Sequence, residues 1–204
     1  MGLRQPTLDF IEESIEHVFG KDTEGLCMLE LGDQVMKCNN IPEPTGKMYF
    51  IRKGYNHTSV DINGLHGALI YDLTKPEQFT KWHNSYDIIT NAGTVEHVEP
   101  FESQYECFNI IHDCLKVGGL AIHIAPDVHE HDERGAWVNH CHFYYSHEFF
   151  KTLAEECGYE LLSSEVIRGN RCVALKKIID VPFMKDQSQF LSMIARRSIK
   201  NVRI

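Results

Sequence analysis

The segment from Leu26 to Leu31 constrains the fold of this chain more than any other stretch. All of its residues except Glu30 are apolar, and no polar residue alternates with them. Such a continuous run is typical of a strand that is buried on both faces of a parallel sheet. Gly32 follows at once, and glycine lets the backbone turn sharply or lets a ligand come close. The segment therefore predicts an α/β fold with a ligand site beyond this strand, although a core strand that simply ends in a glycine turn stays an alternative.

The rest of the chain alternates between helical and strand patterns in the manner of βα units. The predicted helices cover residues 7–19, about 46–53, 100–117, 146–157 and, in the tail, 186–198. The predicted strands cover residues 26–31, 57–62, 68–73, 86–90, 120–125, 159–167 and 171–178. The last two strands form a hairpin, so we expect a mostly parallel seven-stranded sheet between two helix layers, with one reversed strand at its edge.

Composition narrows the class of protein. The 204 residues show no repeat and no linker, so we expect a single domain with a core over about 26–178 and a tail over 179–204. A net charge of -9 argues against a nucleic-acid partner, and no apolar run is long enough to span a membrane. The seven cysteines form no Cys-x-x-Cys pair, and we interpret them as reduced thiols of a cytoplasmic protein.

Five motifs occur in the order in which class I S-adenosylmethionine-dependent methyltransferases carry them. They are Leu29–Gly32, Val60–Ile62, Tyr71–Leu73, the strand Tyr86–Asn91 followed by Glu96–Val98, and Leu115–Leu120. The chain resembles this family over roughly residues 26–178. The resemblance implies a three-layer Rossmann-like sandwich whose last strand is antiparallel, a methyltransferase activity, S-adenosylmethionine as cofactor and S-adenosylhomocysteine as product.

The resemblance also implies which residues contact the cofactor. Glu30 and Gly32 match the motif below its methionine part, Asp61 matches the acid that takes both ribose hydroxyls, and Asp72 matches the reader of adenine. A carboxylate at a strand end suits a ribose diol, because it accepts both donors in charge-assisted hydrogen bonds. The full predicted set is Glu30, Gly32, Asp33, Asp61, Ile62, Asp72, Leu73, Asn91 and Gly93.

The first motif departs from the family pattern after its glycine. Further glycines usually follow, but here Asp33-Gln34-Val35 follow Gly32. The departure counts against a nicotinamide-dependent oxidoreductase, because a dinucleotide pyrophosphate needs glycine-rich backbone at a helix N-terminus. It also gives some weight to a catalytically silent subunit that binds the cofactor and supports a partner.

Histidine is the one compositional excess, with twelve in the chain. Five of them fall between Asp127 and His147, in a polar insertion of the kind that often covers substrate in this family. Histidine takes up a proton near neutral pH, so we predict that His140 or His142 is the general base, with His97 as the competing candidate. A metal site is conceivable from the two His-x-His pairs, but the spacing does not match a metallohydrolase run, and we predict none.

The sequence as a whole predicts methyl transfer to an oxygen or nitrogen of a small molecule. With an acidic composition and no appended recognition domain, a metabolite, sugar or natural-product intermediate is favoured over nucleic acid or membrane as the partner. The sequence leaves the identity of the acceptor and the existence of a homodimer open.

Overall fold

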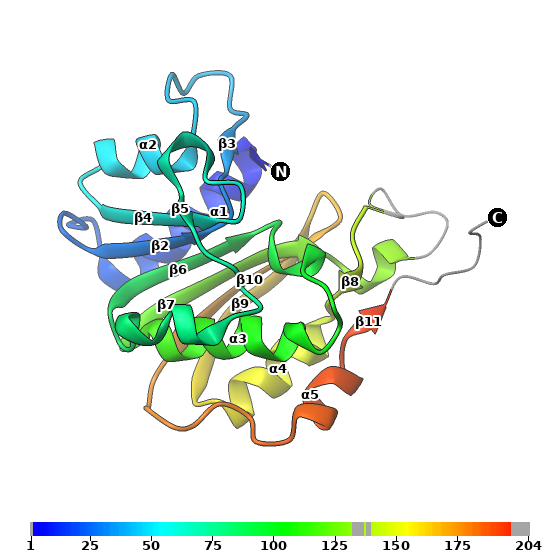
Figure 1. Ribbon diagram of the computed structural model, residues 1–204. Coiled ribbons are helices and arrows are strands. Elements are labelled where there is room, and N and C mark those ends of the chain that lie inside the picture. The colour runs from blue at the N-terminus through cyan, green and yellow to red at the C-terminus, as the bar shows by residue number, and fades with distance from the viewer. Residues whose placement is uncertain (1, 132–136, 138–139, 197–204) are drawn as a thin grey trace.

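A seven-stranded sheet forms the centre of the computed structural model, which describes residues 2–131, 137 and 140–196 (Figure 1). Its strand order is β5-β4-β2-β6-β7-β10-β9. The strands are β2 (Cys27–Leu31), β4 (Asn56–Asp61), β5 (Leu69–Ile70), β6 (Tyr86–Ala92), β7 (Leu115–Pro126), β9 (Tyr159–Ile167) and β10 (Asn170–Lys177). β10 runs antiparallel to both of its neighbours, and the other pairs are parallel. This confirms the mostly parallel sheet with a reversed last strand.

The reversed strand lies inside the sheet, so its predicted position at the edge is wrong. β10 pairs with β7 on one side and with β9 on the other, and β9 forms the edge. Arg168 and Gly169 both have positive φ values, 51° and 79°, as a tight hairpin turn between β9 and β10 requires. The middle of β10, with Cys172 and Val173 both 0% exposed, is more apolar than β9, so burying β10 on both sides is the favourable arrangement.

Helices cover both faces of the sheet (Figure 1). They are α1 (Gln5–Phe19), α2 (Gly46–Arg52), α3 (Ser103–Cys114), α4 (His147–Glu156) and α5 (Gln187–Ser192). One apolar cluster joins the sheet to α1 and α2, and the other joins it to α3, α4 and α5. Met28 belongs to the first cluster and Leu29 to the second, which is why β2 is apolar at successive positions.

Four predicted elements differ most from the structure in length. The strand predicted over 68–73 is only Leu69–Ile70. The helix predicted over 100–117 begins at Ser103 and ends at Cys114, because the next residues are extended and start β7 at Leu115, five residues before its predicted beginning. The tail helix predicted over 186–198 ends at Ser192, and its last predicted residues lie outside the described part of the chain.

Two small sheets were not predicted from the sequence. β1 (Gly2–Leu3) pairs in parallel with β3 (Val35–Met36), and β8 (Phe143–Tyr144) pairs with β11 (Ala195–Arg196), which follows the tail helix. Strands of two residues carry no detectable periodicity, so the sequence pattern cannot indicate them. None of the helices among the described residues is long and apolar enough to cross a membrane.

Candidate active site

A cleft of about 350 Å³ lies where β2, β4 and β6 end. The chain runs from β2 outward to β4 and β5 and then returns to β6 on the other side of β2, so the cleft stands at the switch in strand order. Fifteen residues line it: Gly32, Asp33, Gln34, Val60, Asp61, Ile62, Tyr71, Asp72, Leu73, Thr74, Gly93, Thr94, His97, Val98 and Glu99. The structure therefore gathers most of the predicted cofactor residues, together with His97, around one space.

Gly32 brings the loop after β2 against the loop after β6. Its φ is +88°, and a Cβ atom there would lie 2.2 Å from the Thr94 side-chain oxygen. That oxygen donates to the carbonyl of Leu31 at 2.8 Å, which fixes the second loop to the end of β2. Any side chain at position 32 would force these two loops apart. The sequence predicted the glycine from its motif but gave no sign of Thr94.

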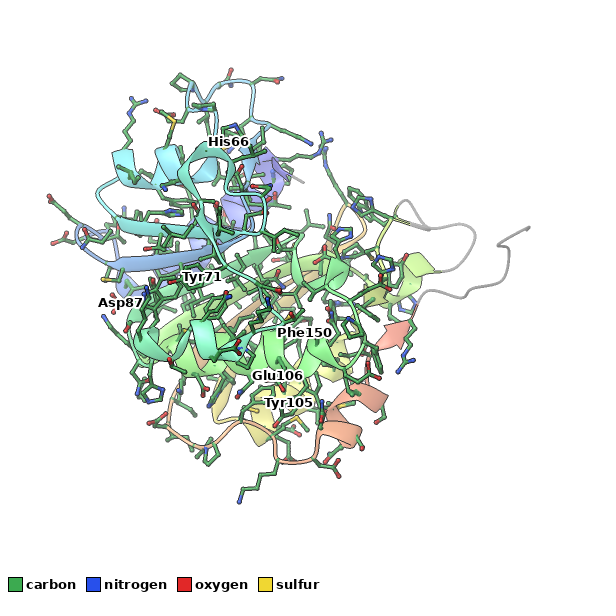
Figure 2. The ribbon with its side chains drawn as sticks, in the orientation of Figure 1. His66, Tyr71, Asp87, Tyr105, Glu106 and Phe150 are labelled. Atoms are coloured by element: carbon green, nitrogen blue, oxygen red, sulfur yellow. The ribbon has the colours of Figure 1, made fainter. Side chains whose placement is uncertain are left out.

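Asp61 at the end of β4 holds the first loop in place. Its Oδ2 accepts the Asp33 N–H at 3.0 Å, and its Oδ1 accepts the Asn63 N–H at 2.9 Å. Each carboxylate oxygen has a second lone pair, so Asp61 can still accept two donors from a ligand. The carboxylate of Asp33 in turn contacts Nδ1 of His66 at 2.5 Å, a partner that the sequence did not predict. His66 is labelled in Figure 2.

Asp72 closes a turn at the far wall of the cleft. Its Oδ1 accepts both the backbone N–H and the hydroxyl of Thr74, at 2.9 and 2.7 Å. These two hydrogen bonds lower the pKa of Asp72, and the one from the Thr74 backbone N–H has the larger effect. Asp72 is therefore ionised at neutral pH. Beside it Tyr71, labelled in Figure 2, lines the cleft and stacks on Trp82 with ring centroids 4.8 Å apart.

Glu30 and Asn91 lie below the cleft rather than on its surface. Glu30 is 1% exposed and accepts the Gln34 N–H at 3.3 Å, and burial raises its pKa to about 8. Asn91 is also 1% exposed and accepts the Val95 N–H at 3.1 Å. Both side chains support the loops that line the cleft. Their direct contact with a cofactor stays a prediction from the resemblance, and this geometry favours a supporting role.

Gln34 is a lining residue that the sequence singled out only as a departure from glycine. It is 2% exposed, and its amide nitrogen lies 3.4 Å from the Thr94 hydroxyl. Its amide oxygen is buried without a hydrogen-bond partner among the described residues, and so is Oδ1 of Asp33. Unpartnered buried acceptors are costly, so the two oxygens suit a ligand that brings N–H or O–H donors into the cleft.

The three predicted catalytic histidines meet at one end of the cleft. His97 lines it, and the ring of His140 lies 5.2 Å from the His97 ring, centroid to centroid. Nδ1 of His142 lies 3.3 Å from Oε1 of Glu99, another lining residue. Burial, and after it the charges of the other two histidines, lower the pKa of His97 to about 4. His97 is therefore neutral at pH 7 and presents an imidazole that can accept a proton.

The described residues hold no group of three or more His, Cys, Asp or Glu side chains that could bind a metal ion. His129 is exposed, and His147 contacts the Ser164 hydroxyl at 2.9 Å on the side of α4 and β9. The side chain of His131 lies outside the described part of the insertion. A metal role for the His-rich segment therefore gains no support from the residues that are described.

The chain shares its fold with solved methyltransferase structures, although no protein-family model and no curated protein matches its sequence. The 1,6-didemethyltoxoflavin-N1-methyltransferase of Burkholderia thailandensis, solved with S-adenosylhomocysteine, aligns with a TM-score of 0.55 at 11% identity over 83% of this chain and 79% of its own. A TehB-like S-adenosylmethionine-dependent methyltransferase from Corynebacterium glutamicum gives 0.52 at 17% identity, over 84% and 86%.

A third similar structure is the Haloferax volcanii complex between the Trm112 methyltransferase activator and a methyltransferase. It gives a TM-score of 0.53 at 13% identity and covers 84% of this chain and 95% of that chain. In all three the match spans most of both chains, as expected when the whole central sheet and its helices superpose. The chain has the Rossmann-like fold of the class I S-adenosylmethionine-dependent methyltransferases.

Proposed function

We propose that this protein is an S-adenosylmethionine-dependent methyltransferase that acts on an oxygen or nitrogen of a small molecule. The observation that carries the proposal is the cleft itself. Acids that close two neighbouring strands, Asp61 and Asp72, share one space with His97 at its other end. A polar nucleoside and a proton acceptor therefore have separate places in one cavity, whose volume suits a small ligand.

The residues of the cleft fit the cofactor part by part. Asp61 has lone pairs left for the two ribose hydroxyls, and Asp72 lies beside Tyr71, whose ring suits the adenine plane. The buried oxygens of Gln34 and Asp33 suit the ammonium group of the methionine part. The sulfonium of the bound cofactor supplies an activated methyl group, and the protein has to align a nucleophile and exclude water.

We propose His97, flanked by His140 and His142, as the general base. The acceptor loses a proton when it takes the methyl group, and His97 is the one of the three histidines that lines the cleft. Its pKa of about 4 keeps the ring neutral with a free lone pair, and so weak a base needs a neighbouring group that stabilises the imidazolium. A small acceptor is supported by the net charge of -9, which repels nucleic acid, and by the Burkholderia thailandensis enzyme, which was solved with the small molecule 1,6-didemethyltoxoflavin.

Calorimetry tests the cofactor assignment directly. We expect S-adenosylhomocysteine to bind and NAD not to bind. The melting temperature should therefore rise with S-adenosylhomocysteine and stay unchanged with NAD, by mass action. Asp61→Ala should weaken the binding of S-adenosylhomocysteine, whereas the matched control Asp22→Ala, at an exposed acid outside the cleft, should leave it unchanged. Binding of NAD without S-adenosylhomocysteine would overturn the proposal and favour the oxidoreductase alternative.

A silent subunit would bind the cofactor equally well, so turnover has to be measured separately. The Haloferax volcanii structure, in which an activator accompanies a methyltransferase, makes a required partner the specific form of this alternative. Methyl transfer from labelled S-adenosylmethionine to a library of small hydroxyl and amine compounds distinguishes the two. Transfer by the isolated chain supports an enzyme, whereas tight cofactor binding with no transfer supports the silent or partner-dependent subunit.

A further inference from the structure

Glu96 is the most completely buried carboxyl group of the described chain outside the lining of the cleft. It lies on the short 3₁₀ turn Val95–His97 and is 0% exposed. No hydrogen bond of normal geometry from the described residues reaches either carboxyl oxygen, although the backbone N–H groups of Thr94 and Glu96 lie near enough to offset part of the rise in its pKa. Its nearest titratable neighbour on the turn is His97, whose Nε2 lies 4.0 Å from Oε1. Burying a carboxyl group without a hydrogen-bond partner costs free energy, so packing alone does not explain why a glutamate stands at this position.

The turn that carries Glu96 is fixed from three sides. Asn91 accepts the Val95 N–H at 3.1 Å, and the amide nitrogen of Gln104 on α3 donates to the carbonyls of Val95 and Val98 at 2.9 and 2.8 Å. The Tyr145 hydroxyl then donates to the Gln104 amide oxygen at 2.5 Å. This network holds the backbone of the turn, and in that arrangement the Glu96 carboxyl is buried 4.0 Å from the His97 ring.

We propose that Glu96 is a positioning residue for the His97 base. This deepens the proposed function and rests on it. A shortening of about 1 Å brings the carboxylate within hydrogen-bonding distance of the His97 Nε2–H. That hydrogen bond places the ring proton on Nε2, orients the ring and leaves Nδ1 free to accept a proton from the methyl acceptor.

In the proposed methyl-transfer step, every bond that breaks and the proton that is released can be accounted for. The acceptor's O–H or N–H bond breaks, its proton moves to Nδ1 of His97, and the electron pair of that oxygen or nitrogen forms the bond to the methyl group. The carbon–sulfur bond of the sulfonium breaks and leaves a neutral thioether. The imidazolium that forms is stabilised by the Glu96 carboxylate, and the proton leaves to solvent through His97, whose side chain is 37% exposed.

The surroundings of Glu96 set the pH at which this arrangement operates. Besides His97, the Tyr145 phenol faces it from the segment before α4, and the thiols of Cys107 on α3 and Cys141 act on that phenol. Burial raises the pKa of both Tyr145 and Cys107, so these two groups stay protonated near neutral pH. Burial also raises the pKa of Glu96 to about 8, so the carboxylate forms as the pH rises through that value.

Nitrogen-15 NMR of the histidine rings tests the inference without any acceptor. In the wild-type chain bound to S-adenosylhomocysteine, we expect the His97 ring shifts to change in a step near pH 8, as Glu96 ionises and the proton settles on Nε2. In Glu96→Gln, which keeps the shape of the side chain, this step should be absent. Glu102→Gln, a change at an exposed glutamate six residues further on, should keep the step.

The pH profile of methyl transfer provides the second readout. A rate that needs the Glu96 carboxylate rises about tenfold per pH unit below the pKa and levels above it. Glu96→Gln should lose that rise and fall roughly 10- to 100-fold below wild type above pH 8, with S-adenosylhomocysteine affinity unchanged. Glu96→Asp should restore part of the rise, because it keeps the carboxyl group.

The outcomes separate this inference from the proposed function. If Glu96→Gln folds, binds S-adenosylhomocysteine and keeps both the NMR step and the pH profile, Glu96 only fills space and the inference is wrong. If the wild-type chain fails to bind S-adenosylhomocysteine, the proposed function fails first. Should Glu96→Gln not fold, the wild-type titration of His97 alone decides, since a flat shift between pH 6.5 and pH 9 would contradict the inference.

Discussion

The two ends of the cleft hold acidic groups in opposite ways. At the end closed by β4, Asp61 and Asp72 accept backbone N–H groups and remain partly exposed. At the other end, Glu96 is fully buried and its carboxyl oxygens make no hydrogen bond to the described residues, beside His97, whose side chain is 37% exposed. Backbone donors and water keep an acid charged, and burial without donors keeps it neutral. At neutral pH the cleft thus has a charged end suited to recognition and a neutral end, where the proposed base lies beside an acid that becomes a carboxylate only near pH 8.

The largest effect should come from the neutral end. Replacement of His97 by alanine removes the proposed base, and positioned acid–base catalysis contributes roughly 10²–10⁴-fold. We expect turnover to fall by about that factor in single-turnover assays, while S-adenosylhomocysteine affinity changes little. His83→Ala, at an exposed histidine outside the cleft, is the control.

The same assay decides between His97 and the pair that the sequence favoured. His140→Ala and His142→Ala should each lower turnover less than His97→Ala, because neither of these two side chains lines the cleft. If either variant loses more turnover than His97→Ala, and His97→Ala stays close to wild type, the general base lies in the His-rich segment and the assignment to His97 is wrong.

The second prediction concerns Glu30, which lies below the charged end but is buried like Glu96. Its pKa rises from the model-compound value of 4.5 to about 8 on folding, so its protonated form favours the folded state. The stability it contributes is complete below pH 4.5 and is lost as the pH rises to about 8. We expect Glu30→Gln, which cannot ionise, to gain on the order of 4 kcal/mol over wild type between pH 4.5 and pH 8.5.

Urea unfolding of both chains at a series of pH values measures this difference. A difference that does not change with pH would show that Glu30 is ionised in the folded protein. Glu30 would then be charged like Asp61 and Asp72, and the buried residues below this end of the cleft would be charged as well as those that line it.

The third prediction tests the charged end. Asp61→Ala should weaken S-adenosylhomocysteine binding by about 1.5–3 kcal/mol, the range for hydrogen bonds to a charged group. It also removes the acceptor of the Asp33 N–H, so a crystal structure or NMR spectrum should check that the first loop stays in place. An unchanged dissociation constant for S-adenosylhomocysteine in calorimetry would show that Asp61 only stabilises the loop and does not bind the cofactor.

The smallest effect is expected at Asp72. Its Oδ1 already accepts two hydrogen bonds from Thr74, and only part of the carboxylate remains for adenine. Asp72→Asn should therefore weaken S-adenosylhomocysteine by about 1 kcal/mol in the same calorimetric series. A loss larger than that of Asp61→Ala would show that adenine, rather than ribose, supplies most of the recognition.

The sequence predicted the sheet well because its strands are apolar runs with glycines and acids at their ends. Gly32, Asp61 and Asp72 could be placed at strand ends, and parallel strands bring their carboxyl ends to one edge of the sheet. The position of β10 inside the sheet could not be predicted, because a hairpin pattern does not say which strand takes the edge.

The depth of a side chain was harder to predict than its place along the chain. Glu30 and Asp61 both stand at strand ends, yet Glu30 lies under α2 while Asp61 faces the cleft. Only the packing of Gly46, where a Cβ would lie 2.5 Å from a Glu30 oxygen, reveals the difference. In the same way, the burial of Glu96 depends on the nearby helix α3 and on Tyr145, which is distant in sequence.

One NMR measurement tests the central claim most directly. The claim is that the cofactor lies across the cleft with its nucleoside at the charged end and its methyl group at the neutral end. With S-adenosylmethionine labelled by carbon-13 at the methyl group, we predict nuclear Overhauser effects from that methyl to the ring protons of His97. Effects to residues beside Asp72 instead, or no binding at all, would contradict the account.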